Sequence, residues 1–147
     1  MGGYVVQLAV RVGKTGRVYA EDIDPRALQH LERRCQKWGL TNVKVILGEV
    51  INPGLPAGKL DLIFIISSYH HFADPVALLR NARSSLKPGG TLVIAEWLPF
   101  EKSQEKYARP QQLKDQVKAA GYRFIRTDPL LKKSNMLIYI FSTGNKE

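Results

Sequence analysis

Residues 60–97 read LDLIFIISSYHHFADPVALLRNARSSLKPGGTLVIAEW, and this stretch decides the fold. It opens and closes with nearly continuous apolar runs, 60–67 and 91–97, which are typical of parallel strands covered on both faces. Between the runs, Asp74-Pro75 is a helix start, because aspartate caps the first turn and proline lacks only an N–H that the turn does not use. The stretch therefore predicts a strand, a helix and a parallel strand.

The same alternation continues outward from this stretch. Residues 87–90 (KPGG) are predicted to be a turn that feeds the strand at 91–97. Further strands are predicted from β-branched runs at 17–21, 43–47, 123–127 and 137–142. Further helices are predicted at 4–12, 25–38 and 110–120, the last two stopped by Gly39 and Gly121. The short connection 130–135 suits an antiparallel hairpin at the sheet edge. The sequence thus predicts an open, mostly parallel α/β sheet with helices on both faces.

Length and composition favour one soluble domain over residues 1–147. The single cysteine, Cys35, excludes an intrachain disulfide and favours a reducing compartment. Arg11 and Lys14 interrupt the apolar N-terminal residues, so no signal peptide is expected. No apolar run is long enough to span a bilayer. We therefore expect a cytoplasmic protein that does not associate with membranes.

The formal net charge of +9 and the pI near 9.8 raise the question of a nucleic-acid partner. The lysines and arginines are scattered, however, and aromatic residues are not interleaved with them as in a single-strand platform. A solvated basic surface is favoured over a polyanion site, while an acidic substrate remains possible. Nucleic acid is therefore a possible but not a favoured partner.

Ligands of open α/β sheets bind beyond the carboxyl ends of the strands, so the residues that follow each strand are candidate site residues. Asp22 follows the run 17–21, where a carboxylate can accept hydrogen bonds from two ribose hydroxyls. The alternative is that Asp24 caps a helix and Asp22 is merely exposed. Glu49 follows the next strand, where it either accepts a bond from an adenine amino group or is a surface acid. The ribose role is favoured for Asp22.

Four spaced segments together resemble class I S-adenosylmethionine-dependent methyltransferases of the small-molecule type. The segments are GRVYAEDIDPRAL, VILGEV, LDLIFIISSYHHFADPVALLRNARSSLKPGG and TLVIAEW. The resemblance implies a Rossmann-like fold and S-adenosyl-L-methionine as cofactor. It also implies cofactor contacts from the strand ends: Asp22 at the ribose, Ile23 on the adenine, Glu49 and Val50 at the adenine edge, and Ser67 by the methionine part.

Two adjacent histidines, His70 and His71, match a pair common in that family. They are either structural, hydrogen-bonded at a strand-to-helix turn, or catalytic, with His70 as the base that deprotonates an acceptor. The structural role is favoured, and Tyr69 is a second candidate for positioning the acceptor. No metal site is predicted, because two adjacent histidines and a distant cysteine make no ligand set.

The chain departs from the family's pattern at its start. Gly2, Gly3 and Tyr4 match the last positions of the family's glycine-rich cofactor loop, and Met1 stands where an earlier glycine is expected. The family's first strand and the acidic residue of that loop have no counterpart. We expect the domain to be truncated by one central strand, and self-association, as a dimer, to complete or cap the sheet.

Two functions of different kinds are consistent with the sequence. The first is methyl transfer from S-adenosylmethionine to a small-molecule acceptor, with residues 98–110 as a mobile cover. The alternative is a non-catalytic methyltransferase-like module with a degenerate cofactor loop. An oxidoreductase is less favoured because it would also need the glycine loop. An RNA methyltransferase is less favoured because the chain lacks an Asn-Pro-Pro-Tyr-like tetrapeptide.

Overall fold

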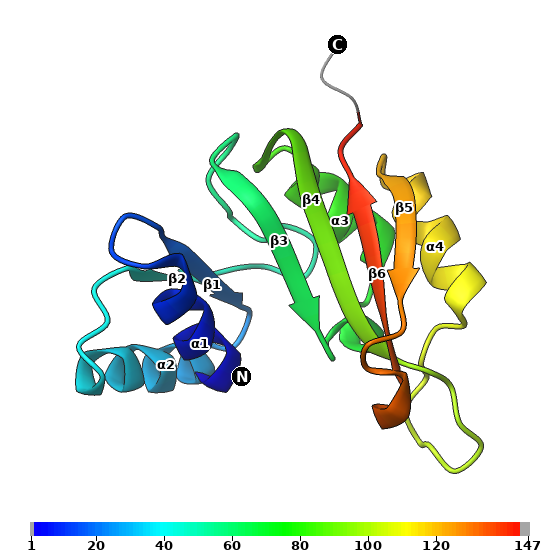
Figure 1. Ribbon diagram of the computed structural model, residues 1–147, viewed down its shortest axis with the longest axis horizontal. Coiled ribbons are helices and arrows are strands. Elements are labelled where there is room, and N and C mark those ends of the chain that lie inside the picture. The colour runs from blue at the N-terminus through cyan, green and yellow to red at the C-terminus, as the bar shows by residue number, and fades with distance from the viewer. Residues whose placement is uncertain (1, 145–147) are drawn as a thin grey trace. The chain divides into compact units, whose positions relative to one another are not determined.

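The computed structural model describes residues 2–144. The chain divides into two compact units, unit 1 (Met1–Leu55) and unit 2 (Pro56–Glu147), whose elements are labelled in Figure 1. The described strands form two separate sheets, a two-stranded one in unit 1 and a four-stranded one in unit 2. The sequence predicted a single domain over residues 1–147, and this stays a prediction.

Unit 1 consists of two helices and two parallel strands. Its elements are α1 (Gly2–Val12), β1 (Val18–Asp22), α2 (Pro25–Lys37) and β2 (Val43–Leu47). Strand β1 pairs with β2 from Val18↔Val43 to Asp22↔Leu47. Its buried core comes from β1 and α2, with half-buried side chains around it: Ala20, Leu31 and Cys35, surrounded by Val5, Leu40, Val43 and Val45.

Local signals set the ends of α2. The Asp24 carboxylate accepts a bond from the Arg26 N–H at 2.8 Å and caps the helix, and Pro25 takes the first helical position. Gly39 has a φ of +63°, the left-handed conformation that stops a helix at little cost only for glycine. The predictions for both ends of this helix are therefore confirmed.

Unit 2 is a four-stranded mixed sheet with two α-helices. Its elements are β3 (Leu60–Ile66), the 3₁₀ turn η1 (Tyr69–His71), α3 (Pro75–Arg83), β4 (Leu86–Trp97), α4 (Pro110–Ala119), β5 (Arg123–Asp128), the 3₁₀ turn η2 (Lys132–Ser134) and β6 (Met136–Ser142). The strand order is β3-β4-β6-β5. Strand β3 runs parallel to β4, whereas β4–β6 and β6–β5 are antiparallel, which confirms the C-terminal hairpin with β5 at the edge.

The helices α3 and α4 lie behind this sheet in Figure 1 and cover one of its faces. Paired residues of neighbouring strands bury their side chains on that face: Ile63 beside Leu92 and Phe141, and Ile65 beside Ile94 and Tyr139. On the opposite face, Leu62 and Phe64 of β3 stay exposed. The two faces of the sheet therefore differ in how well they are covered.

The predicted turn at 87–90 is instead part of β4, which begins at Leu86. The pairing with β3 jumps from Leu60↔Leu86 to Leu62↔Thr91, so the KPGG residues form a bulge within the strand. Gly89 takes a φ of +74° there, a conformation that favours glycine. The chain does bend at this point, but it stays in the sheet because pairing resumes on both sides of the bulge.

The α/β, Rossmann-like fold predicted from the sequence is confirmed. Strands β1 and β3 belong to different sheets, and residues 2–144 supply no strand that pairs with both. This agrees with the predicted lack of one family strand. Met1, predicted to stand where an earlier glycine is expected, lies outside the described residues. No helix within residues 2–144 combines the length and apolar character needed to cross a membrane.

Candidate functional site

The carboxyl ends of β1 and β2 meet at one edge of unit 1. The two strands are parallel, and the N–H of Gly48, just after β2, donates to the carbonyl of Asp22 at 3.0 Å. Residues that follow the two strands therefore lie side by side at the edge where ligands of open α/β sheets bind. This places Asp22 and Glu49, both predicted from the sequence, at the same edge of unit 1.

Asp22 is held by its own loop. Its Oδ1 accepts a bond from the N–H of Asp24 at 2.9 Å. Asp24 caps the helix, as the alternative interpretation had it, but Asp22 is half-buried rather than merely exposed. The half-buried Asp22 carboxylate is thus fixed at the end of β1, and each of its two oxygens can accept more than one bond.

Glu21 lies against the backbone where β2 ends. A Cβ added to Gly48 would collide with the Glu21 carboxylate, so this side chain fills the space that glycine leaves. Burial, with a smaller contribution from the charge of Asp22, raises the pKa of Glu21 from 4.5 to about 7. The sequence pointed to Asp22 alone, and the close approach of Glu21 to Gly48 was missed.

Two large apolar side chains are exposed beside these carboxylates. Ile23 is 58% exposed and Val50 is 54% exposed. Glu49 is exposed as well, and its backbone forms a tight turn with Asn52, with a bond of 2.7 Å from the Glu49 N–H to the Asn52 carbonyl. Carboxylate oxygens can accept hydrogen bonds from ribose hydroxyls, and the apolar side chains beside them can pack against a flat base. These groups therefore fit the chemistry of an adenosine.

Gly2 and Gly3 occupy the first turn of α1. The first N–H groups of a helix have no partner inside it and can bind a ligand. A Cβ added to Gly3 would meet nothing within 4 Å. The cofactor role predicted for these glycines stays a prediction.

In unit 2, Ser67 directly follows β3 in a left-handed conformation with a φ of +48°. Its N–H donates to the carbonyl of Ala95 at 2.9 Å, and its hydroxyl accepts the indole N–H of Trp97 at 2.7 Å. A non-glycine residue in this conformation is uncommon and is found at functional or tightly held turns. The hydrogen bonds explain how Ser67 is held, and its predicted contact with the cofactor stays a prediction.

Tyr69 is a core residue. Its side chain is buried, and its hydroxyl donates to Oε1 of Gln116 on α4 at 2.7 Å. Burial raises the pKa of Tyr69 far above its usual value, and the nearby Glu96 carboxylate raises it further. This placement does not favour the predicted role in positioning an acceptor, because the hydroxyl is engaged inside the unit.

His70 is bound to a buried carboxylate that the sequence analysis missed. Its Nδ1 lies 3.0 Å from Oε2 of Glu96, and its backbone N–H donates to the same oxygen at 3.1 Å. The other oxygen, Oε1, accepts the N–H of Trp97 at 2.8 Å. The side chains are 5% and 1% exposed. A charged residue in the apolar run TLVIAEW was the available signal, because a buried carboxylate needs partners.

Rings from the loop between β4 and α4 gather around His70. Tyr107 meets it edge-on, with ring centroids 4.6 Å apart, and Phe100 stacks on Tyr107 at 5.9 Å. The exposed neighbour His71 lies 4.0 Å from His70, measured between ring centroids. The predicted cover at 98–110 therefore supplies an aromatic contact to His70, from Tyr107.

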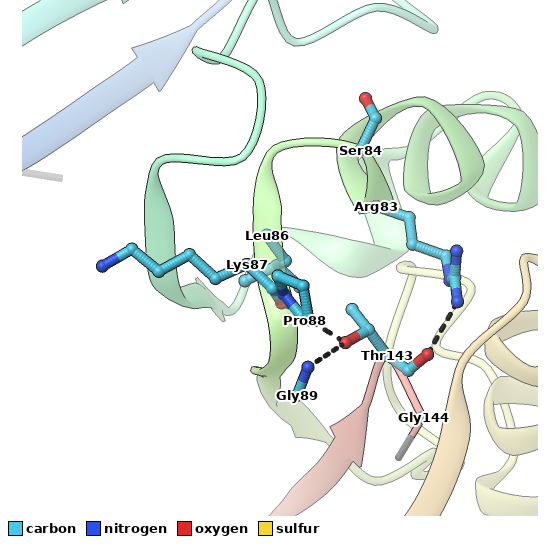
Figure 2. Close-up of a pocket in the computed structure, with 8 residues that line it drawn as sticks. All are labelled: Arg83, Ser84, Leu86, Lys87, Pro88, Gly89, Thr143 and Gly144. Atoms are coloured by element: carbon cyan, nitrogen blue, oxygen red, sulfur yellow. Dashed lines mark hydrogen bonds between the residues drawn. The ribbon is translucent and has the colours of Figure 1, made fainter. Parts of the chain in front are cut away.

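A separate pocket lies at the other end of β4. Figure 2 shows its lining, which includes Arg83, Lys87 and Thr143. The guanidinium of Arg83 donates to the carbonyls of Gly121 at 2.9 Å and Thr143 at 2.6 Å. Because the pocket lies at the opposite end of β4 from Trp97, it is distinct from the candidate site.

The fold of this chain is shared with S-adenosylmethionine-dependent methyltransferases of known structure. The solved structure of a SAM-dependent methyltransferase from Aquifex aeolicus superimposes with a TM-score of 0.84 at 26% identity, over 97% of this chain and 77% of that one. Residues 1–136 match the family model described as a methyltransferase domain. The chain belongs to this methyltransferase family.

Curated relatives carry more specific names. A demethylmenaquinone methyltransferase of Geobacillus sp. (strain WCH70) is 31% identical over 63% of this chain and 40% of its own length. The aklanonic acid methyltransferase DauC of Streptomyces sp. (strain C5) is 28% identical over 63% of this chain and 42% of its own. The chain therefore spans less than half the length of these relatives.

Proposed function

We propose that the chain is an S-adenosylmethionine-dependent methyltransferase acting on a small molecule with a planar ring. The observation that carries this proposal is the His70–Glu96 pair with Tyr107 and Phe100 beside it. A histidine held by a buried carboxylate can take a proton, and stacked aromatic rings bind flat molecules.

Unit 1 supplies the groups that fit the adenosine part of the cofactor. Asp22 would accept bonds from the ribose hydroxyls, Ile23 and Val50 would cover the base, and Glu49 would accept from its amino group. The cofactor, when bound, supplies a methyl group on a positively charged sulfur. The chain then needs mainly to align an acceptor with that group and to exclude water.

His70 is the proposed base for an acceptor hydroxyl. The Glu96 carboxylate can only accept a hydrogen bond when ionised, so it favours the imidazole tautomer with the proton on Nδ1. In that tautomer Nε2 carries the lone pair and is the atom that accepts the acceptor's proton. Glu96 acts through His70 and is a positioning residue.

An aromatic acceptor is supported by the ring cluster, and a small-molecule acceptor is supported by the relatives. Phe100 is 48% exposed, so its ring presents surface on which a second ring can stack. The relatives named for demethylmenaquinone and aklanonic acid are methyltransferases of small molecules. The net charge of +9 favours an anionic or phenolic acceptor over a cationic one.

Calorimetric titration with S-adenosylhomocysteine tests cofactor binding. We expect a dissociation constant in the micromolar range, and Asp22→Ala to weaken it about 10- to 100-fold, since bonds to a charged group contribute about 1.5–3 kcal/mol. Asp115→Ala, an exposed acid on α4, is the matched control and should leave binding unchanged.

The non-catalytic module is the second candidate. The [4+2]-cyclase SpnF has the same fold at a TM-score of 0.82 and 13% identity, so this fold does not by itself establish methyl transfer. No ladder joins the sheets of the two units within residues 2–144. If titration with millimolar S-adenosylhomocysteine gives no heat of binding, the result favours the module and counts against the enzyme.

Transfer of a labelled methyl group to a panel of hydroxylated aromatic molecules tests the reaction itself. We expect His70→Gln to lower kcat and Phe100→Ala to raise KM, because the first removes the proton acceptor and the second removes stacking surface. Equal rates on aromatic and aliphatic hydroxyl acceptors would contradict the proposed acceptor class.

The location of the protein is also a proposal. Cys35 is a free, buried thiol within unit 1, which suits a reducing compartment. A cytoplasmic protein is the proposal that this thiol supports.

A further inference from the structure

The structure brings an acidic residue of the 98–109 loop to the histidine pair. His70, His71 and Glu105 each place a possible metal-ligating atom within 4.8 Å of the others. The histidine pair and the distant Cys35 alone had predicted no metal site. Glu105 is separated from His71 by more than thirty residues along the chain, so only the fold brings the three together.

From these contacts we propose a binding site for a divalent transition-metal ion, formed by His70, His71 and Glu105. Two imidazoles and one carboxylate are a common three-ligand set for zinc, with a fourth position open to water or to an oxygen of a small molecule. The site lies wholly within unit 2 and does not depend on the cofactor.

Glu96 gives His70 the orientation that a metal ligand needs. Metal-binding histidines usually donate their second ring N–H to a carboxylate, which fixes the tautomer and strengthens the ligating nitrogen. Glu96 is 1% exposed and lies 3.0 Å from Nδ1 of His70, so Nε2 is the nitrogen that remains for a metal. Tyr107 packs edge-on against the same imidazole and limits its rotation.

His71 and Glu105 can move their ligand atoms to the separation that a bound ion requires. Ligand atoms around a tetrahedral zinc ion are about 3.4 Å apart, since each bond is about 2.0–2.2 Å long. One ligand atom from each of the three residues lies within 4.8 Å of the others, and this spread exceeds the tetrahedral separation by at most about 1.4 Å. His71 and Glu105 are exposed, so side-chain rotation provides this movement without repacking the core.

Metal binding and proton transfer at His70 would compete. A metal ion on Nε2 occupies the lone pair that the proposed methyl transfer uses. If that function is correct, zinc inhibits the transfer, and His71→Ala relieves the inhibition. The metal site itself is measured without cofactor or acceptor, so its failure and the failure of the proposed function are distinguishable.

The test uses the full chain purified without a histidine tag. Zinc binding is followed by calorimetry, and cobalt binding by the visible absorption of a four-coordinate ion. We expect one ion per chain, loss of binding in His71→Ala and in Glu105→Gln, and 10- to 100-fold weaker binding in Glu96→Gln. His30→Ala, which removes the remaining histidine of the chain, and Glu101→Gln, in the same loop as Glu105, should bind as the unaltered chain does.

Three results would overturn the site. They are no binding at 100-fold molar excess of zinc, unchanged affinity in both His71→Ala and Glu105→Gln, or loss of binding in His30→Ala. Circular dichroism of each variant shows whether it is folded. Since His71 and Glu105 are exposed, their replacement should not unfold the chain.

Discussion

Two neighbouring acids at the end of β1 behave differently because of where their side chains lie. Asp22 is fixed at the strand end by a bond from its own loop, whereas Glu21 is pressed against Gly48. The space occupied by Glu21 exists only because residue 48 has no side chain. Successive side chains of a strand point to opposite faces, so alternation separates the two acids but gives no indication of this close approach.

We predict that Gly48→Ala destabilises the chain by about 1–3 kcal/mol, because a new methyl group must displace the Glu21 carboxylate. Urea denaturation measures the change in the free energy of unfolding. The double variant Glu21→Ala/Gly48→Ala should recover most of the loss, since the alanine at 21 clears the space. Additive effects in this double-mutant cycle would show that the two residues are not coupled.

The raised pKa of Glu21 predicts a pH dependence of stability. Its folded pKa of about 7 exceeds its ordinary value of 4.5, so its contribution is complete below 4.5 and is lost as the pH rises through about 7. Glu21→Gln cannot titrate. The free energy of unfolding of the unaltered chain, minus that of Glu21→Gln, should therefore fall between pH 5 and pH 8. A difference that stays constant from pH 5 to pH 8 would contradict this assignment.

At the scale of elements, short-range signals were sufficient for most of the fold. Proline after aspartate marked the starts of α2 and α3, and glycine marked the stop of α2. The turn predicted for the KPGG segment was wrong, because Pro and Gly are equally suited to a turn and to a bulge. Only the resumed pairing with β3, a long-range interaction, distinguishes the two.

The candidate site was harder to predict than the elements. His70 was identified from the family pattern, but its partner Glu96 lies on strand β4, 26 residues further along the chain. Glu105 and Tyr107 lie in a loop whose sequence carries no local signal for a contact with His70. Such contacts depend on tertiary packing, and a single sequence gives no information on which loop residue meets which strand end.

We predict that Asp74→Ala destabilises unit 2 by about 1 kcal/mol, since its carboxylate caps α3 by accepting the N–H of Ala77 at 2.9 Å. Chemical denaturation followed by circular dichroism measures the loss. Asp61→Ala is the matched control, because its ion pair with Lys87 is exposed and should contribute less than about 0.5 kcal/mol. Equal losses in the two variants would argue against the cap.

At the scale of the whole molecule, strand β3 is an edge strand with exposed apolar side chains. Leu62 is 47% exposed and Phe64 is 39% exposed. Strand edges with apolar side chains favour pairing with another chain unless they are blocked by charge. We propose that a second copy of this chain covers this strand.

Light scattering after size-exclusion chromatography tests this proposal. We expect a concentration-dependent dimer, and Phe64→Lys to shift it to the monomer by placing a charge on β3. Ile125→Lys alters an exposed residue of β5, the opposite edge strand, and should leave the dimer intact. An unaltered chain that is monomeric at every concentration would rule the dimer out.

The division into two units also determines what intrinsic fluorescence can report. The two tryptophans of the chain fall one in each unit: Trp38 at the end of α2, and Trp97 at the end of β4. Trp38 is 63% exposed, whereas the indole of Trp97 is hydrogen-bonded to Ser67. Replacing either one with phenylalanine leaves a single tryptophan, so the unfolding of each unit can be followed by the emission of its own tryptophan.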